Sequence, residues 1–275
     1  MAGFFYNGKS TKNVISSSEL ILATFDTVDS VVGINRENVS GESTISRPIS
    51  NEYGTTYENL EIEYGLIKKN KTPITESEQR IIETWLTSSK ISQDIQFYDT
   101  CSEIVTDIYC GKFTETEWKP MSGGFAGLTF KFTCNTAYGK RYFSQNFTLN
   151  NEMKTFVIEN PSDELEEYTY PVITFYQTSN PTEKVIIQNI TDNKNIMTFM
   201  TRRNIKMSMD CKNCIPYDQT NSGIITYKDL GWEDVSNIYW LRLLPGSNEL
   251  TMSCAATVTI NIKFDYTCKR VGGWL

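Results

Sequence analysis

The 275-residue chain contains no histidine. Histidine is the base of Ser-His-Asp and Cys-His catalytic sites, the commonest side-chain metal ligand and the usual proton carrier near neutral pH. Its absence excludes all three kinds of site, so an enzyme built on this chain would have to work with carboxylates, Lys, Tyr or Cys. These residue types show no catalytic arrangement either. We therefore predict no enzymatic activity, no catalytic residues and no cofactor.

Three other features are missing. No apolar run is long enough to span a bilayer, which predicts no membrane insertion. The opening MAGFFYNGKS lacks the basic and apolar regions of a secretory signal. The formal net charge is -7, and the Lys and Arg residues form no patch. A chain of this kind gains little from releasing counterions from a phosphate backbone, so we predict no sequence-specific nucleic-acid binding.

The seven cysteines are an odd number in a chain without an export signal. Reduced, mostly buried thiols are the expected state. The stretch Cys211-Lys212-Asn213-Cys214 is the one motif with a metal or redox appearance. A four-cysteine zinc site needs a second close pair, and thirteen residues separate Cys254 from Cys268. The motif also follows an alternating strand and does not open a helix as a thioredoxin motif does. We predict no metal site.

What the sequence has in abundance is strand-forming residues, including 14 Phe and 15 Tyr. The most regular stretch is Ile238–Cys268. A Leu-Pro-Gly-Ser-Asn turn interrupts it, and its last part alternates apolar and polar residues strictly. This period of two predicts a half-buried antiparallel strand. The apolar side of that strand carries Val258, Ile260, Ile262, Phe264, Tyr266 and Cys268.

The N-terminal half reads as β-structure carrying one helix. Phe4–Ser10 predicts two short strands joined by an Asn-Gly turn. Thr75 and Glu78 have the spacing of a capping box, which predicts a helix start there. Ile81, Ile82, Trp85 and Leu86 follow at helical spacing and are expected to face the core. The Gly-rich step at 122–127 predicts a hairpin turn. The polar stretch Gly33–Thr56, with a weak strand at Thr44–Ile49, predicts an exposed loop or an extended hairpin.

A domain boundary is expected at Asn135–Gly139, giving domains at 1–138 and 139–275. The second half shows no strong helical period, only short β-runs separated by turn residues, which predict an antiparallel sandwich. These runs are Tyr142–Leu149, Lys154–Glu159, Tyr170–Gln177, Lys184–Ile190, Ile196–Met200, Asn204–Asp210, Ile224–Tyr227, Tyr239–Leu244, Glu249–Cys254 and Ala256–Cys268.

Several stretches, in their order along the chain, resemble the distal tail proteins (Dit) of long-tailed bacteriophages. The opening Phe5-Tyr6-Asn7-Gly8-Lys9-Ser10 is similar to the start of that family. The later stretches that carry the resemblance are Thr75 through Trp85-Leu86, Phe97-Tyr98-Asp99, Tyr109 with Gly111, Trp118, Phe130–Cys134, Asn221–Ile225, Trp240 and Leu243–Asn248. One departure is Val14-Ile15-Ser16-Ser17, which replaces the family's Asp-Phe-Gly-Leu.

The resemblance implies a mainly β protein whose second domain is a galectin-like β-sandwich, although the chain lacks the His of galectin sugar sites. It further implies a structural role at the tail tip or baseplate hub, with no catalysis. The N-terminal domains would form a homo-hexameric ring around a channel for DNA, between the tail tube protein and a tail-associated hub or lysin-like protein. The outer domains could hold receptor-binding or baseplate proteins. Location in the virion, after assembly in the bacterial cytoplasm, would follow.

Two other functions stay open. The first is a cell-wall or glycan-binding module for host adsorption, using exposed aromatics of the second domain such as Trp232 or Trp240. Against it, aromatics within a β-domain are usually core residues. The second is a hydrolase, which the missing histidine disfavours. The carboxylate pairs Asp163-Glu164 and Glu166-Glu167 lie in a polar stretch and indicate a solvated surface rather than an acid/base pair.

Overall fold

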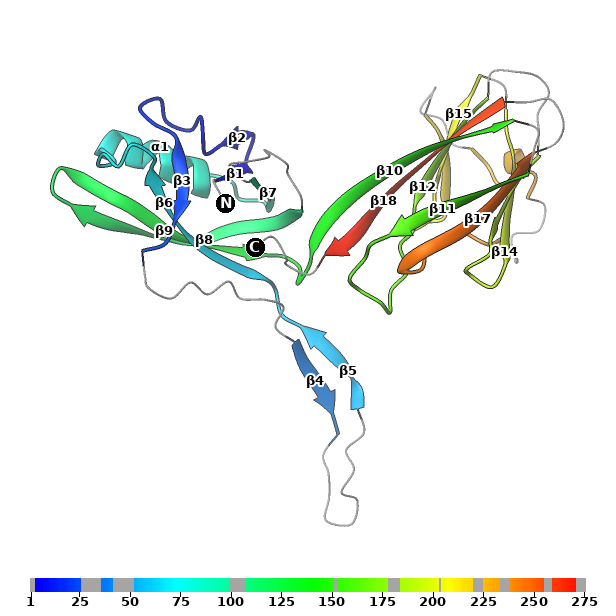
Figure 1. Cartoon of the computed structure of the whole chain (residues 1–275), viewed down its shortest axis with the longest axis horizontal. Helices are drawn as coiled ribbons and strands as arrows, with labels where there is room; N and C mark the ends of the chain where they lie inside the picture. The colour runs from blue at the N-terminus through cyan, green and yellow to red at the C-terminus, as the bar shows by residue number, and fades with distance from the viewer. Residues whose placement is uncertain are drawn as a thin grey trace, which may run out of the picture. The chain divides into compact units, whose positions relative to one another are not determined.

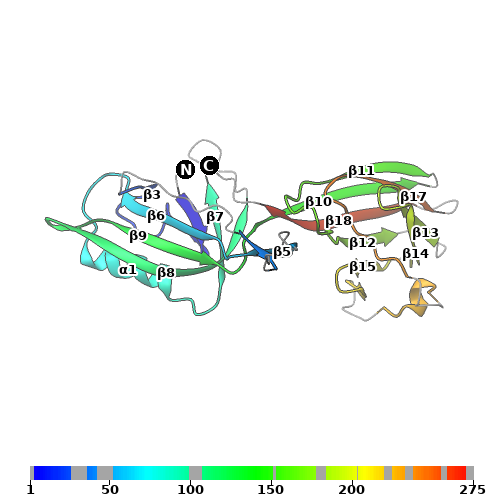
Figure 2. The same ribbon diagram turned by 90° about the horizontal axis from the view of Figure 1, so that it is seen from below.

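The computed structural model describes residues 3–25, 36–41, 52–98, 107–150, 153–177, 184–202, 204–219, 225–232, 238–254 and 259–270. The chain forms two compact units, shown in Figures 1 and 2. The first comprises Met1–Lys140 with Arg270–Leu275, and the second comprises Arg141–Lys269. Each unit has its own hydrophobic core. The mainly β fold class predicted from the sequence is confirmed, with one α-helix among the described residues.

The first unit is built on one curved antiparallel sheet with the strand order β2-β1-β7-β8-β9-β6-β3. Thr11 links β1, next to one end of this sheet, to β3 at the other end. Its N–H donates to the Phe4 carbonyl, and its own carbonyl accepts from the Leu20 N–H. The strands are β1 (Gly3–Tyr6), β2 (Lys9–Ser10), β3 (Leu20–Ala23), β6 (Glu61–Lys68), β7 (Gln93–Tyr98), β8 (Ile108–Met121) and β9 (Gly124–Cys134).

Local turn chemistry shapes this sheet as the sequence predicts. Asn7 and Gly8 both have positive φ angles, of 45° and 72°, which the tight turn between β1 and β2 requires. Gly124 begins β9 at the predicted hairpin turn, with a φ of 142°. A Cβ atom there would lie 2.4 Å from the Ile74 carbonyl oxygen. Glycine therefore lets this hairpin approach the segment that leads into the helix, where Ile74 and Phe125 pair.

Helix α1 (Glu76–Thr87) begins at the predicted capping box, with Thr75 as the N-cap. It contributes Ile82, Trp85 and Leu86 to the core of the first unit, as expected. The prediction for Ile81 is wrong, because 47% of that side chain is exposed. Ile81 instead lines a groove on the surface beside the helix.

A second, two-stranded sheet pairs β4 (Arg36–Ser40) with β5 (Glu52–Tyr57). The described parts of the polar stretch 33–56 therefore form an extended hairpin, one of the two predicted forms. The weak strand predicted at Thr44–Ile49 lies outside the described residues.

The second unit is a sandwich of two antiparallel sheets. One has the order β16-β15-β12-β18-β10 and the other β11-β17-β13-β14. Their inner faces meet in a single core, where the rings of Phe175 and Phe199 lie 4.0 Å apart. The strands are β10 (Gly139–Asn150), β11 (Lys154–Asn160), β12 (Val172–Gln177), β13 (Lys184–Asn189), β14 (Asn195–Met200), β15 (Lys206–Asp210), β16 (Ile215–Asp218), β17 (Gly246–Cys254) and β18 (Thr259–Arg270).

Strand β18 confirms the alternation seen in the sequence. Ile260, Ile262, Phe264, Tyr266 and Cys268 are all buried, and the intervening residues face outward. Two other strand predictions are wrong. Tyr239–Leu244 is irregular apart from a single bridge between Leu243 and Thr169. The described residues of 224–227 lead into a short 3-10 helix, η1 (Lys228–Leu230). Both segments carry large apolar residues that pack on the core without joining a ladder.

Candidate interaction surfaces

Trp85 fixes helix α1 to the N-terminal strand. Its indole N–H donates to the Tyr6 carbonyl at 2.9 Å, and its ring stacks on Phe4 with centroids 5.3 Å apart. The indole is buried, so this hydrogen bond satisfies a polar group that would otherwise be costly inside the core. The helix surface next to β1 and β2 is thereby held in a fixed place.

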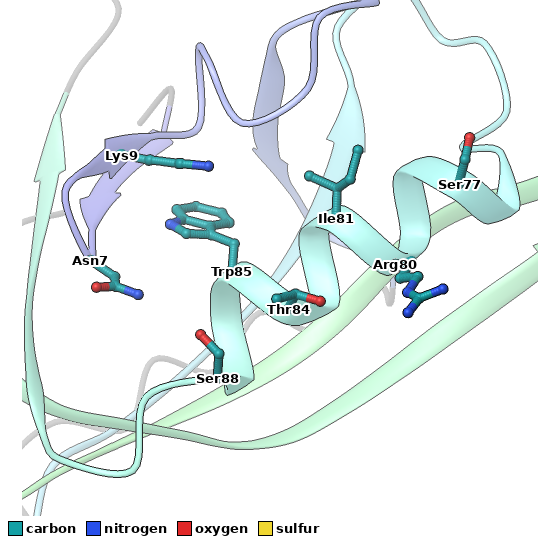
Figure 3. Close-up of a pocket in the computed structure, with 8 residues that line it drawn as sticks. All are labelled: Asn7, Lys9, Ser77, Arg80, Ile81, Thr84, Trp85 and Ser88. Atoms are coloured by element: carbon teal, nitrogen blue, oxygen red, sulfur yellow. The ribbon is translucent and has the colours of Figure 1, made fainter.

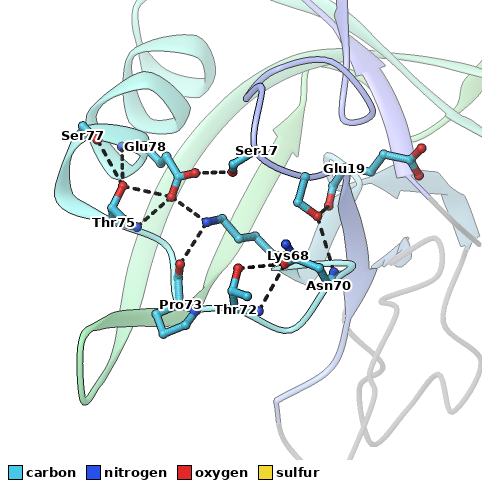
Figure 4. Close-up of polar contacts among 10 residues, drawn as sticks. Ser17, Glu19, Lys68, Asn70, Thr72, Pro73, Thr75, Ser77 and Glu78 are labelled. Carbon is cyan, nitrogen blue, oxygen red and sulfur yellow. Dashed lines mark hydrogen bonds and ion pairs between the residues drawn. The ribbon is translucent and has the colours of Figure 1, made fainter.

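A polar network fixes the start of the same helix. The Glu78 carboxylate accepts hydrogen bonds from the Thr75 N–H and from the Ser17 hydroxyl, and it pairs with the Lys68 ammonium group at 2.7 Å (Figure 4). Lys68 also donates to the Pro73 carbonyl at 2.9 Å. Burial opposes ionisation, but the hydrogen bonds outweigh it and lower the pKa of Glu78 to about 2. The network ties together β6, α1 and the loop before β3.

A shallow groove of about 410 Å³ opens on the surface between α1 and the turn that joins β1 to β2. Asn7 comes from the turn and Lys9 from β2, and the other lining residues come from α1 and its C-cap residue Ser88 (Figure 3). Ile81 contributes its exposed side chain. Within the described residues, neither Lys9 nor Arg80 has an ion-pair partner. The groove therefore combines an exposed apolar residue with two cationic groups, on a chain with a net charge of -7.

The β4–β5 hairpin is the most exposed element of the first unit. Every residue of β4 is exposed, and so are five of the six residues of β5. Its large side chains include Val39 and Tyr53, which are 43% and 69% exposed. Tyr57 anchors its base through a ring contact with Tyr138 at 5.5 Å. An isolated two-stranded hairpin is marginally stable in water. Its exposed apolar side chains make it a candidate contact surface.

Carboxylates surround Lys131 on the outer face of strands β6, β8 and β9. The Lys131 ammonium group lies 2.8 Å from Glu61 and 3.8 Å from Glu63. Glu115 is the cross-strand partner of Lys131. The hydrogen bond that Lys131 donates to Glu61, together with the neighbouring carboxylates, raises the pKa of Lys131. Carboxylates thus outnumber the ammonium group on this part of the surface.

In the second unit, a buried carboxylate organises the segment that lacks strand structure. The Arg242 guanidinium donates two hydrogen bonds to the Asp192 carboxylate, of 2.8 and 3.1 Å. The Tyr239 hydroxyl donates to the same carboxylate at 2.7 Å. The Arg242 guanidinium also lies over the Tyr168 ring, 4.0 Å from its centroid. The hydrogen bond from Arg242 is the main cause that lowers the pKa of Asp192. The cluster has a structural explanation, because it anchors the irregular segment 238–244.

The thiols show no organised site. Six cysteines lie in the described part of the chain, and none of them forms a disulfide. Burial raises the pKa of Cys134 to about 12 and also raises that of Cys211. Cys211 and Cys214 flank the turn between β15 and β16, with Cys214 at a positive φ of 57°. No group of three or more Cys, Asp or Glu side chains with metal-binding geometry occurs among the described residues.

Of the two aromatic residues suggested for glycan stacking, Trp232 is not available. Trp232 is 9% exposed, its indole N–H donates to the Thr198 carbonyl, and its ring meets Trp240 edge-on at 5.3 Å. Trp232 is therefore a core residue, and the expectation that it could stack on a sugar is wrong. Sequence reasoning also missed the groove at α1, because Lys9 and Arg80 are far apart in the chain and only the fold brings them together.

Two family models cover almost the whole chain. A phage tail protein N-terminal domain matches residues 1–136, and a phage tail C-terminal domain matches residues 137–263. The chain belongs to the phage tail protein family. It is a structural protein of the phage tail, and hence a virion protein. Among the described residues of this tail protein, no helix has the length and apolarity needed to cross a membrane.

A solved structure shares the fold. The tail protein is similar to the Dit (gp 19.1) protein of phage SPP1, described as a paradigm of the hub adsorption apparatus in phages that infect Gram-positive bacteria. The TM-score is 0.61 at 16% identity, over 96% of this chain and 99% of that one. A chain of the phage p2 baseplate in its activated conformation with Ca matches with a TM-score of 0.43 at 10% identity, over 90% and 91% of the two chains. The match to the SPP1 Dit protein, together with the two phage tail domains, confirms the resemblance to the distal tail proteins. None of the curated protein sequences matches the chain.

Proposed function

We propose that this tail protein assembles into a hexameric ring that joins the tail tube to a hub protein and leaves a channel for DNA. The observation that carries the proposal is the correspondence of almost the whole chain with phage tail domains and with the Dit fold. The N-terminal domain, 1–138, forms the ring, and the sandwich domain, 139–275, offers surfaces for receptor-binding or baseplate proteins. The ring is assembled in the bacterial cytoplasm before it joins the virion.

The described surfaces support a scaffold rather than an enzyme. Titratable side chains with strongly shifted pKa values have structural explanations, which are hydrogen bonds for Glu78 and burial for Cys134. The net charge of -7 limits adhesion of DNA that passes through a channel.

The β4–β5 hairpin is the proposed arm between neighbouring subunits. Its exposed Val39 and Tyr53 would be covered by a second copy of the chain, which also supplies the packing that an isolated hairpin lacks. The groove at α1 is a second surface that can take part in the ring, since Ile81 offers apolar area beside two cations.

Native mass spectrometry of the purified chain tests the ring, and electron microscopy of the same sample tests the channel. We expect a species of six subunits and a round particle with a central hole. Replacing Gly33–Thr56 by a short Gly-Ser linker should leave both units folded and abolish this species. Tyr53→Ser should weaken it, whereas Met121→Ser, which changes an exposed apolar residue on a different hairpin, should not. A strict monomer at high concentration, without affinity for tail tube or hub protein, would contradict the proposal.

A further inference from the structure

The outer face of the larger sheet in the second unit carries a polar groove of about 300 Å³. Its lining residues come from four strands that are neighbours in the sheet (Figures 1 and 2). The order of these strands is β15-β12-β18-β10. They are Asn146, Phe147, Thr148, Thr174, Tyr176, Lys206, Asn261, Ile262 and Lys263. No carboxylate is among them.

Strand register explains why this part of the face is hollow. Tyr176 is the cross-strand partner of both Lys206 and Asn261, so these three long side chains form one row across the sheet. In the next row, Thr174 lies between Ser208 and Lys263. The short side chains of Thr174 and Ser208 therefore lie beside the longer ones of the first row, and the groove forms above the short ones.

The polar groups at the floor of the groove already have hydrogen-bond partners. The hydroxyl groups of Thr174 and Ser208 are hydrogen-bonded to each other at 2.8 Å, and these residues are 4% and 0% exposed. Because Ile173 and Phe175 point into the core, Thr174 and Tyr176 must point to the opposite face. The polar lining thus stands on rigid strands, which hold side chains more accurately than loops do.

The walls offer groups that suit a hydroxyl-rich ligand. Tyr176 is 37% exposed and presents a ring with an apolar face and a polar tip. The Thr148 hydroxyl donates to Asn261 Oδ1 at 3.1 Å. This bond orients the amide, so that its NH₂ end is the part that a ligand would meet. Asn146 adds a second amide, which can both donate and accept.

The charge of the groove selects among such ligands. Lys206 and Lys263 are both in the lining, on a chain where Asp and Glu outnumber Lys and Arg by 33 to 26. Lys263 has an ion pair with Asp265 at 2.8 Å, but both side chains are about 40% exposed, and such pairs are weak. An incoming anion can therefore compete for the ammonium group. The two ammonium groups are thus the only charged groups among the lining residues, on a protein with a net charge of -7.

We propose that this groove binds an anionic saccharide unit, whose acidic group is a carboxylate or a phosphate. Tyr176 stacks on the sugar ring, Asn261 and Asn146 bind its hydroxyl groups, and Lys263 and Lys206 bind the acidic group. This function is additional to the structural role in the tail, and it uses different residues from those suggested by the sequence.

Isothermal titration of the full-length chain tests the proposal with four probes: glucuronic acid, glucose 6-phosphate, glucose and inorganic phosphate. We expect at least one anionic sugar to bind at least about tenfold more tightly than glucose or phosphate alone. The anionic sugar that binds identifies the acidic group. Binding should weaken as salt is added, because an exposed ion pair is screened.

Lys263→Gln and Asn261→Ala should each reduce affinity for that sugar by at least about tenfold. Lys184→Gln is the matched control, because it removes an exposed lysine from the other sheet of the same unit. All three changes are on the surface, and circular dichroism checks that the fold is kept. No binding of either anionic sugar at about 10 mM overturns the proposal. Equal affinity for inorganic phosphate, or an undiminished affinity in both groove variants, overturns it as well.

Discussion

The ammonium group of Lys68 lies 2.7 Å from the Glu78 carboxylate, although the Lys68 side chain is only 4% exposed. A lysine is buried in this way only when its charge is matched and its donors have acceptors. Glu78 supplies the opposite charge, and the Pro73 carbonyl supplies a second acceptor. The pair connects β6 with the first turn of α1, and thus the sheet with the helix that lines the groove of Figure 3.

Glu78→Gln should destabilise the first unit by about 3 kcal/mol at pH 7, because it leaves the Lys68 charge buried without a counter-charge. The loss depends on pH. The folded-state pKa of Glu78 is lowered from 4.5 to about 2, so its contribution is fully present above pH 4.5 and disappears as the pH falls toward 2. Hydrogen exchange of the α1 amides, measured from pH 7 to pH 2.5 in both proteins, checks this convergence.

The matched control is Glu19→Gln. Glu19 pairs with Lys69 at 2.8 Å, but the two side chains are 42% and 62% exposed. We expect no measurable change in the exchange of α1. If both variants behaved alike, burial would not be the reason for the importance of the Lys68–Glu78 pair.

Ile81 and Ile82 are adjacent in sequence, but their substitution should change the stability of the protein by very different amounts. Ile82→Ala should cost about 3 kcal/mol of unfolding free energy, because Ile82 is fully buried. Ile81→Ser should change stability by less than about 0.5 kcal/mol, since its side chain is already 47% exposed. Chemical denaturation of both variants measures the difference.

The Ile81→Ser variant also tests whether the groove at α1 takes part in subunit association. If this groove takes part in the ring, the variant should remain folded yet lose subunit association. Thr87→Ser, another exposed helix position outside the groove lining, serves as the control. A stable hexamer of Ile81→Ser would remove the groove from the interface and leave the fold unaffected.

Arg242→Met should destabilise the second unit by about 3 kcal/mol at pH 7, because the Asp192 carboxylate is 3% exposed and would lose its only guanidinium partner among the described residues. Arg242 lowers the pKa of Asp192, so the wild type is stabilised above the unfolded-state pKa of that group. In the variant the buried carboxylate favours its protonated form. The gap between the two proteins should therefore narrow as the pH falls toward 3.

Tyr168→Leu separates the two contacts of Arg242. It keeps apolar area beside the guanidinium but removes the aromatic ring, which should cost about 0.5 to 1 kcal/mol. Thermal unfolding at pH 7 and pH 4 compares the variants. A Tyr168→Leu loss as large as that of Arg242→Met would mean that stacking, and not the ion pair, holds the segment 238–244.

Features that depend on near neighbours could be predicted from the sequence. The capping box at Thr75, the Asn7-Gly8 turn and the alternation of β18 each rest on residues within a few positions of one another. Most strands of the second unit were predicted for the same reason. The strand predicted at Tyr239–Leu244 was wrong, because the alternating apolar residues of this segment pack on the core without a neighbouring strand to pair with. No local sequence pattern reveals the absence of that neighbour.

Surfaces could not be predicted in the same way. The sequence suggested Trp232 as a residue that stacks on a sugar, but its side chain is buried. The sequence predicted Ile81 as a core residue, but its side chain is exposed. The groove that we assign to an anionic saccharide needs Asn146, Tyr176, Lys206 and Asn261 together, from four separate strands. Their spacing along the chain carries no sign of that neighbourhood.

The sequence by itself determined that the protein is mainly β, that it has no histidine chemistry, and that its motifs follow the order of distal tail proteins. These conclusions come from composition and from short-range periodicity, which backbone geometry converts directly into strands and turns. Only the tertiary structure decided which side chains are buried and which ones meet. Burial and contact depend on strand register and on packing between distant segments, and those are set when the whole unit folds.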